Sequence, residues 1–312
     1  MKARSPEDVL AMVPLVLGFV PNDSLVMLTF QADRMFHGRV DLPESARDIR
    51  QVAATLLEPA ARHRVTKVLF IGYAADPRRV DPVTREVADR FKRAGIEVLG
   101  SLAADGRRYW PLPLGPDDTG TEYDAGAHPF AAEAVLNGLV THGSREELAA
   151  TLTPDPAAVA RVATALARRS GTLAPGAVAA EAAWAADLVR RGVRGRKPLR
   201  VGQLARLVSG LQDLVVRDAA WLTLRRVDAH QHVEFWTAVV KRCPASHLAA
   251  PAALLGFAAW ASGRGALAWC GVDVALTAQP GYSLATLLAE GLQAAMPPST
   301  WDDMVGDGDA AS

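Results

Sequence analysis

The stretch from Val65 to Leu102 constrains the fold more than any other part of the sequence. Its pattern predicts a strand, a helix and a second strand in that order. Val65 to Tyr73 is rich in β-forming residues and nearly uncharged, which is typical of a central strand buried on both faces. Val83 to Ala94 has the spacing of a helix, and Ile96 to Leu102 predicts another strand. Strands joined by such a helix are parallel, and the crossover is right-handed. The sequence therefore predicts an α/β sheet.

The N-terminal stretch predicts a capped helix followed by a hairpin of two strands. Ser5 and Asp8 have the spacing of a capping box, and Gly18 suits the end of a helix. Leu25 to Phe30 is a short apolar run, and a polar turn leads from it into Met35 to Leu42. Strands joined this closely are expected to pair antiparallel.

The second half of the chain predicts helices. Pro111 to Pro129 is rich in proline, glycine and acidic residues, which predicts a domain boundary or a long surface loop. Alanine-rich segments with helical spacing follow it. Pro280 can be placed at the proline that closes a tetratricopeptide unit. Leu255-Gly256, Ala268 and Ala275 then fall on the Leu-Gly and two alanine positions of that unit, with its turn at Ser262-Gly263. No second copy is found, so a single helical hairpin is predicted and not a repeat array.

With 312 residues the chain is long enough for two domains. We expect an α/β architecture in which a mixed α/β domain over residues 1–125 precedes an all-α domain over residues 126–299 with a tetratricopeptide-like helical hairpin. Residues 300–312 are expected to form a flexible acidic tail.

Composition excludes several classes of protein. Lys plus Arg and Asp plus Glu both number 34, and this neutral balance argues against a protein that coats nucleic acid or an anionic membrane. Cys243 and Cys270 suit reduced thiols in a cytoplasmic protein. The longest apolar stretch, Leu248 to Gly263, is shorter than the ~20 residues that span a bilayer. We expect no signal peptide and no membrane partner.

Several motifs resemble one family. L-A-x-V-P-x-x-L-G-F-x-P-x-D-S-L-V runs from Leu10 to Val26, and it is similar to the opening of an actinobacterial family of unknown function, number 4192. Three later pieces agree with this resemblance: Arg39 to Pro43, Val216-Arg217-Asp218, and Ala258-Ala259-Trp260 through Pro280-Gly281-Tyr282. The resemblance covers nearly the whole chain, and it implies no activity, because the family has none established.

If the N-terminal domain binds a small molecule, the expected place is the carboxyl ends of its parallel strands. Asp76 follows the first of these strands, and Asp105 and Arg107 follow the second. A carboxylate and a guanidinium together could hold a polar ligand or exchange protons with it. Residues of these types also occur in any solvated loop. Arg39 and Asp41 share one face of a strand. They could line a polar site, but a solvated or helix-covered face is the interpretation that we favour.

Arg190 to Arg200, RRGVRGRKPLR, is a concentrated basic run. It could attract nucleic acid or an acidic partner, but no aromatic residue is interleaved to stack on bases. A solvated linker between two helices is the alternative that we favour. His230 and His232 are two residues apart, so on a helix they do not share a face. We predict no metal site there and expect both side chains to be exposed or half-buried.

The chain lacks a glycine-rich phosphate loop, a G-x-S-x-G elbow, H-E-x-x-H and paired C-x-x-C motifs. The sequence thus names no cofactor and no catalytic residue. Our first prediction is a non-enzymatic cytoplasmic interaction or regulatory protein that binds another protein or itself. The alternative is a small-ligand sensor or enzyme that uses Asp76, Asp105 and Arg107, and nucleic-acid association through Arg190 to Arg200 is weaker.

Overall fold

The computed structural model describes residues 3–32, 36–116, 118–136, 140–169, 175–196 and 198–303. The chain divides into two compact units, here called the sheet unit (residues 1–145 and 293–297) and the helical unit (residues 146–292 and 298–312). Most of the predicted acidic tail lies outside the described residues. The domain boundaries near residues 125 and 299 stay predictions.

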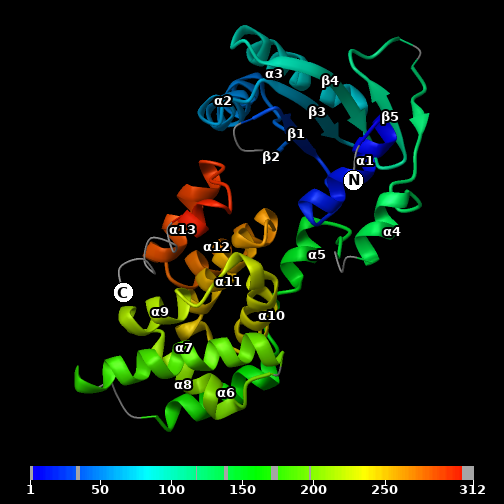
Figure 1. The fold of residues 1–312 in the computed structure, drawn as a ribbon. Coiled ribbons are helices and arrows are strands. Elements are labelled where there is room, and N and C mark those ends of the chain that lie inside the picture. Colours follow the sequence, from blue (N-terminus) through cyan, green and yellow to red (C-terminus); the bar gives the residue numbers. More distant parts are fainter. Residues whose placement is uncertain are drawn as a thin grey trace. The chain divides into compact units, whose positions relative to one another are not determined.

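One six-stranded mixed sheet forms the centre of the sheet unit (Figure 1). Its order is β2-β1-β3-β4-β5-β6, with the bounds β1 (Ser24–Phe30), β2 (His37–Asp41), β3 (Lys67–Tyr73), β4 (Glu97–Ala104), β5 (Arg108–Pro111) and β6 (Thr121–Glu122). β3 and β4 are parallel, and every other neighbouring pair is antiparallel. The predicted hairpin and the predicted strand–helix–strand unit are both confirmed. The short β6 was not predicted, because two residues carry no periodicity.

Helices cover both faces of this sheet. The unit contains α1 (Pro6–Leu17), α2 (Ala46–Arg62), the 3₁₀ turn η1 (Pro77–Arg79), α3 (Val80–Arg93) and α4 (Pro129–Leu136). α2 and α3 pack on the face that carries Leu25, Met27 and Phe70, whereas α1 packs on the opposite face, over Val26 and Leu28 (Figure 1). Alternate residues of β1 are therefore buried on opposite sides, as a central strand requires.

The predicted caps of α1 are present. The Ser5 hydroxyl accepts a hydrogen bond from the Asp8 backbone N–H, and the Asp8 carboxylate accepts one from the Ser5 N–H. Gly18 ends the helix with φ 81°, a left-handed conformation that favours glycine. Local sequence chemistry therefore fixes both ends of the helix.

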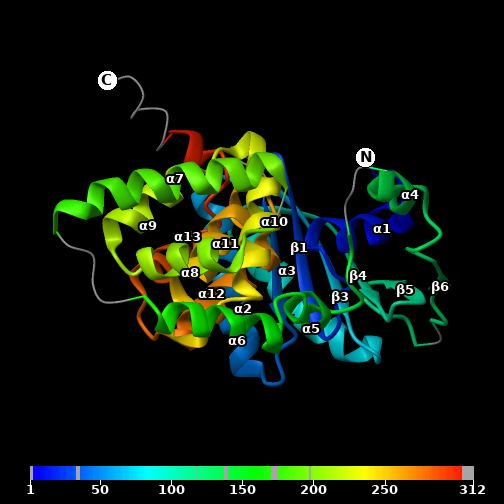
Figure 2. The same cartoon turned by 90° about the horizontal axis from the view of Figure 1, so that it is seen from below.

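The remaining part of the chain is helical. Its helices are α5 (Arg145–Ala150), α6 (Pro156–Ala167), α7 (Val178–Gly195), α8 (Val201–Gly210), α9 (Leu214–Trp221), α10 (Ala229–Val240), α11 (Ala249–Ala261), α12 (Gly265–Ala278) and α13 (Ser283–Gln293), with short 3₁₀ turns η2 (Pro175–Ala177), η3 (Arg226–Asp228) and η4 (Ala245–His247). α7 packs against α9 and α10 (Figure 2). The mixed α/β and all-α organisation expected from the sequence is confirmed.

α11 and α12 form the predicted helical hairpin, with the turn at Ser262-Gly263. The two backbones approach so closely that a Cβ on Gly271 would lie 2.8 Å from the Gly256 Cα. Ala268 and Ala275 are completely buried. The small residues at the predicted spacing therefore serve close helix packing.

Two details of the sequence interpretation were wrong. The basic run is not a linker over its whole length, because α7 continues through Gly195. Val193 is buried there, and its burial favours the extra helical turn. His232 is only 1% exposed, although an exposed or half-buried side chain was expected, whereas His230 is exposed.

Candidate functional site

The carboxyl ends of β2, β3 and β4 lie in one row with residues of β1 and β5, and four of the five residues in this row are polar. The strand register aligns Asp41 with Ser24, Ser24 with Tyr73, Tyr73 with Ala104, and Ala104 with Tyr109. Aligned residues of neighbouring strands point to the same face of a sheet, here the face covered by α1. We call these five residues the edge row.

Tyr73 is the central member of the edge row and its most unusual one. The side chain is 3% exposed, and its hydroxyl has no hydrogen-bond partner among the described residues. Burial raises the pKa of Tyr73 well above 10, with a smaller contribution from Tyr123. The group is therefore a neutral phenol at physiological pH and can donate a hydrogen bond. A buried polar group without a partner is rare, and it often marks a place for water or a ligand.

Tyr123 lies near the Tyr73 phenol, and Asp105 lies near Tyr123. Burial raises the pKa of Tyr123 to about 12, and the charge of Asp105 adds to the shift. The Tyr109 and Tyr123 rings meet edge to face, with centroids 6.1 Å apart. Tyr73 at the end of β3, Tyr109 in β5 and Tyr123 just after β6 thus form a tyrosine cluster, and the charge of Asp105 acts on Tyr123.

The start of α1 supplies acidic groups to the same region. The Tyr109 hydroxyl donates to Glu7 Oε1 at 2.6 Å, and this bond is the main cause of a lowered Glu7 pKa. Asp8 Oδ1 lies 3.0 Å from His128 Nε2. The sequence interpretation used Asp8 as a cap alone, because nothing local indicates partners more than a hundred residues away.

Arg39 lies beside the other end of the edge row, where it contacts Asp41 and Ser24. Arg39 Nη1 pairs with Asp41 Oδ1 at 2.6 Å, and Arg39 Nε donates to Ser24 Oγ at 3.0 Å. The Arg39 side chain is 17% exposed, and its guanidinium lies 5.9 Å from the centroid of the Phe19 ring. Arg39 therefore links the exposed Asp41 carboxylate to the buried Ser24 hydroxyl.

The three ligand-binding residues predicted from the sequence lie at this same end of the sheet. Asp76 Oδ1 accepts from the Arg78 N–H at 3.0 Å and begins η1. Asp105 Oδ1 accepts from the backbone N–H groups of Arg107 and Arg108 at 2.7 and 2.6 Å. All three predicted side chains are exposed. Both carboxylates thus stabilise turns, and their role toward a ligand stays a prediction.

The basic run makes ion pairs within the helical unit. Arg191 pairs with Asp187 one helical turn earlier, and Arg196 pairs with Glu234 of α10. Arg226, which lies outside the basic run, pairs with Asp302.

The described residues contain neither a metal-binding cluster nor a membrane-spanning helix. No group of three potential metal-ligating side chains gathers there. No helix in those ranges is long and apolar enough to cross a membrane.

The comparisons with known proteins give one match. The family described as a domain of unknown function (DUF4192) matches residues 6–299 of the chain. No curated protein matches. No solved structure matches either.

Proposed function

The chain belongs to the DUF4192 family, and because the function of that family is unknown we propose a function from the site: binding of a small polar ligand between α1 and the edge row. The observation that carries this proposal is the buried Tyr73 hydroxyl, which has no partner among the described residues. A buried hydroxyl without a hydrogen bond costs ~1–3 kcal/mol. A ligand that accepts this hydrogen bond recovers the loss, so binding has a clear source of free energy.

The donors around the site favour a ligand with an exposed oxygen. Tyr73 offers a neutral O–H, and Arg39 offers a guanidinium two strands away, with Ser24 between them. A carboxylate, phosphate or carbonyl oxygen accepts bonds from such groups. A general acid works best with a pKa near the working pH, whereas the pKa of Tyr73 lies far above it. The site therefore favours ligand sensing over proton transfer.

A thermal-shift panel of nucleotides, acyl metabolites, amino-acid metabolites and metal ions tests the proposal on the full chain. A ligand at a hundred times its dissociation constant stabilises by ~2.7 kcal/mol, which raises the unfolding midpoint by several degrees. We expect Tyr73→Phe to abolish the shift and Tyr282→Phe, in the helical unit, to preserve it. An empty panel, or a shift that survives in Tyr73→Phe, would contradict the proposal.

An interaction role for the helical unit is the second candidate. Large apolar side chains are exposed on α9 and the turn that follows it: Leu214 (59%), Val215 (58%), Leu222 (52%) and Val227 (90%). Large exposed apolar side chains favour contact with a protein surface, which we take to be a second copy of the chain. Light scattering over a wide range of concentration tests this role. A dimer that Val227→Asp dissociates supports it, and a monomer at every concentration contradicts it.

We also propose a cytoplasmic location, because the two cysteines suit reduced thiols. We propose an actinobacterial origin from the family resemblance. Nucleic-acid association through Arg190 to Arg200 is the least favoured role, because Arg191 and Arg196 already pair with carboxylates of the same unit.

A further inference from the structure

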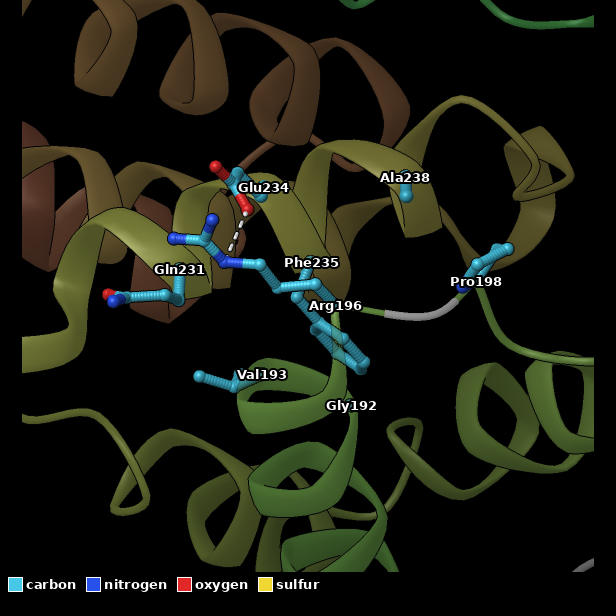
Figure 3. Close-up of a pocket in the computed structure, with 8 residues that line it drawn as sticks. All are labelled: Gly192, Val193, Arg196, Pro198, Gln231, Glu234, Phe235 and Ala238. Atoms are coloured by element: carbon cyan, nitrogen blue, oxygen red, sulfur yellow. Dashed lines mark ion pairs between the residues drawn. The ribbon is translucent and has the colours of Figure 1, made fainter. Parts of the chain in front are cut away.

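A pocket lies between the end of α7 and one face of α10, within the helical unit (Figure 3). Its volume is about 140 Å³. An apolar cavity of about 150 Å³ accommodates a benzene ring, so the space suits a single ring or a branched chain of similar size. Nothing in the proposed function of the sheet unit uses this pocket.

Sequence chemistry explains the apolar wall. Gly192 has no Cβ, and a Cβ built there would lie 2.4 Å from the Phe235 ring, so glycine is needed for the ring to pack on α7. The Phe235 side chain is 8% exposed, and Val193, Pro198 and Ala238 continue the apolar lining around it (Figure 3).

The rim is polar and comes from both sides of the pocket. Arg196 Nε lies 3.6 Å from Glu234 Oε2, beyond hydrogen-bond distance, and the two side chains are 61% and 45% exposed (Figure 3). This solvent-exposed ion pair crosses the rim of the pocket, and no hydrogen bond joins its two side chains. Gln231 adds a buried Oε1 atom that has no partner among the described residues.

The charged side chains of the pocket lining are Arg196 and Glu234. Glu234 is the carboxylate that Arg196 faces, and it also lies 3.3 Å from His230 Nε2. Arg264 is close enough to Glu234 to feel its charge, although burial is the larger effect and lowers the Arg264 pKa. The Glu234 carboxylate therefore keeps the positive charge of Arg264 near it when Arg196 pairs with a second anion.

We propose that this pocket binds a small carboxylate with an aromatic or branched apolar body. The apolar body packs against Phe235, and the carboxylate pairs with Arg196, which turns away from Glu234 to meet it. A hydroxyl or amide N–H on the ligand satisfies the Gln231 oxygen. Arg196 is well suited to this exchange, because its pair with Glu234 is exposed and weak.

Isothermal titration of the full chain with benzoate tests the proposal. Arg196→Asn removes the guanidinium and suits the left-handed backbone at this residue (φ 46°). We expect it to weaken benzoate binding about tenfold, the loss of one charge-assisted hydrogen bond. Glu234→Gln removes the competing carboxylate, so we expect it to strengthen binding. The neutral isostere benzamide should bind more weakly than benzoate.

Arg191→Gln is the matched control, since Arg191 lies on the same helix, is exposed and pairs with Asp187 instead of the pocket. It should leave benzoate binding unchanged. Absence of binding at millimolar benzoate, or equal affinity in Arg196→Asn and Arg191→Gln, would overturn the proposal. If Arg196→Asn fails to fold, Glu234→Gln decides: tighter binding supports the proposal and unchanged or weaker binding overturns it.

Discussion

Replacement of Tyr73 by phenylalanine tests whether the buried hydroxyl has a structural partner. The phenol is 3% exposed and makes no hydrogen bond with the described residues, so the folded state bears the cost of burying it. That cost is ~1–3 kcal/mol, and removal of the hydroxyl removes it. We therefore expect Tyr73→Phe to raise the free energy of unfolding by about 1 kcal/mol. For a unit of this size the unfolding midpoint should rise by roughly 2–4 °C.

Tyr109→Phe is the contrasting variant, because it removes a hydroxyl of the same cluster that is paired. Its bond to Glu7 is 2.6 Å long and charge-assisted. Glu7 is partly exposed, so we discount the loss for solvent screening and expect about 1 kcal/mol of destabilisation. Differential scanning calorimetry of both variants measures the contrast. A Tyr73→Phe midpoint that falls as far as that of Tyr109→Phe would refute the reasoning, since it would reveal a structural partner for Tyr73.

Three further predictions concern packing, charge and pH. Gly271→Ala should destabilise the helical unit by about 1–3 kcal/mol in urea unfolding, because its Cβ would overlap the α11 backbone, whereas Gly265→Ala meets open space and should be nearly neutral. Arg206→Gln should lower the free energy of unfolding by about 2 kcal/mol in the same assay, because it removes the bidentate guanidinium partner of the buried Glu181 carboxylate. The Arg206 side chain is 37% exposed, and solvent screening therefore reduces this loss of stability. Burial lowers the pKa of His232 below its ordinary value of 6.5, so the unfolded chain binds the proton more tightly and stability should fall as the pH drops below that value. Scanning calorimetry from about pH 7.5 to about pH 5.5 should show this decrease, and His232→Gln should reduce it.

The sequence predicted those parts of the fold that depend on short-range chemistry. The capping box of Ser5 and Asp8, the Gly18 helix end and the strand–helix–strand unit all depend on residues close together in the chain. The same holds for the α11–α12 hairpin, where small residues at fixed spacing in the sequence indicate close packing of the two helices. These local preferences can be read from the sequence because the tertiary contacts of the folded chain favour the same local structures.

The candidate site could be predicted only in outline. The carboxyl ends of the parallel strands were the expected place, and Asp105 does lie near the tyrosine cluster. Tyr73 was overlooked because it ends an apolar strand and resembles any other core residue in the sequence. Its significance depends on register with Ser24 and on the absence of a partner for one oxygen atom, and neither property has a local signal.

Fluorine NMR of the full chain labelled with 3-fluorotyrosine tests the central claim most directly. The chain has only four tyrosines, so each resonance can be assigned by one phenylalanine substitution. Three of them form the tyrosine cluster, and Tyr282 in the helical unit serves as an internal reference. With a ligand identified by thermal shift, we predict that the Tyr73 and Tyr123 resonances move and that Tyr282 stays in place. A titration that moves Tyr282 alone, or none of the four, would contradict the assignment of the ligand site to the edge row.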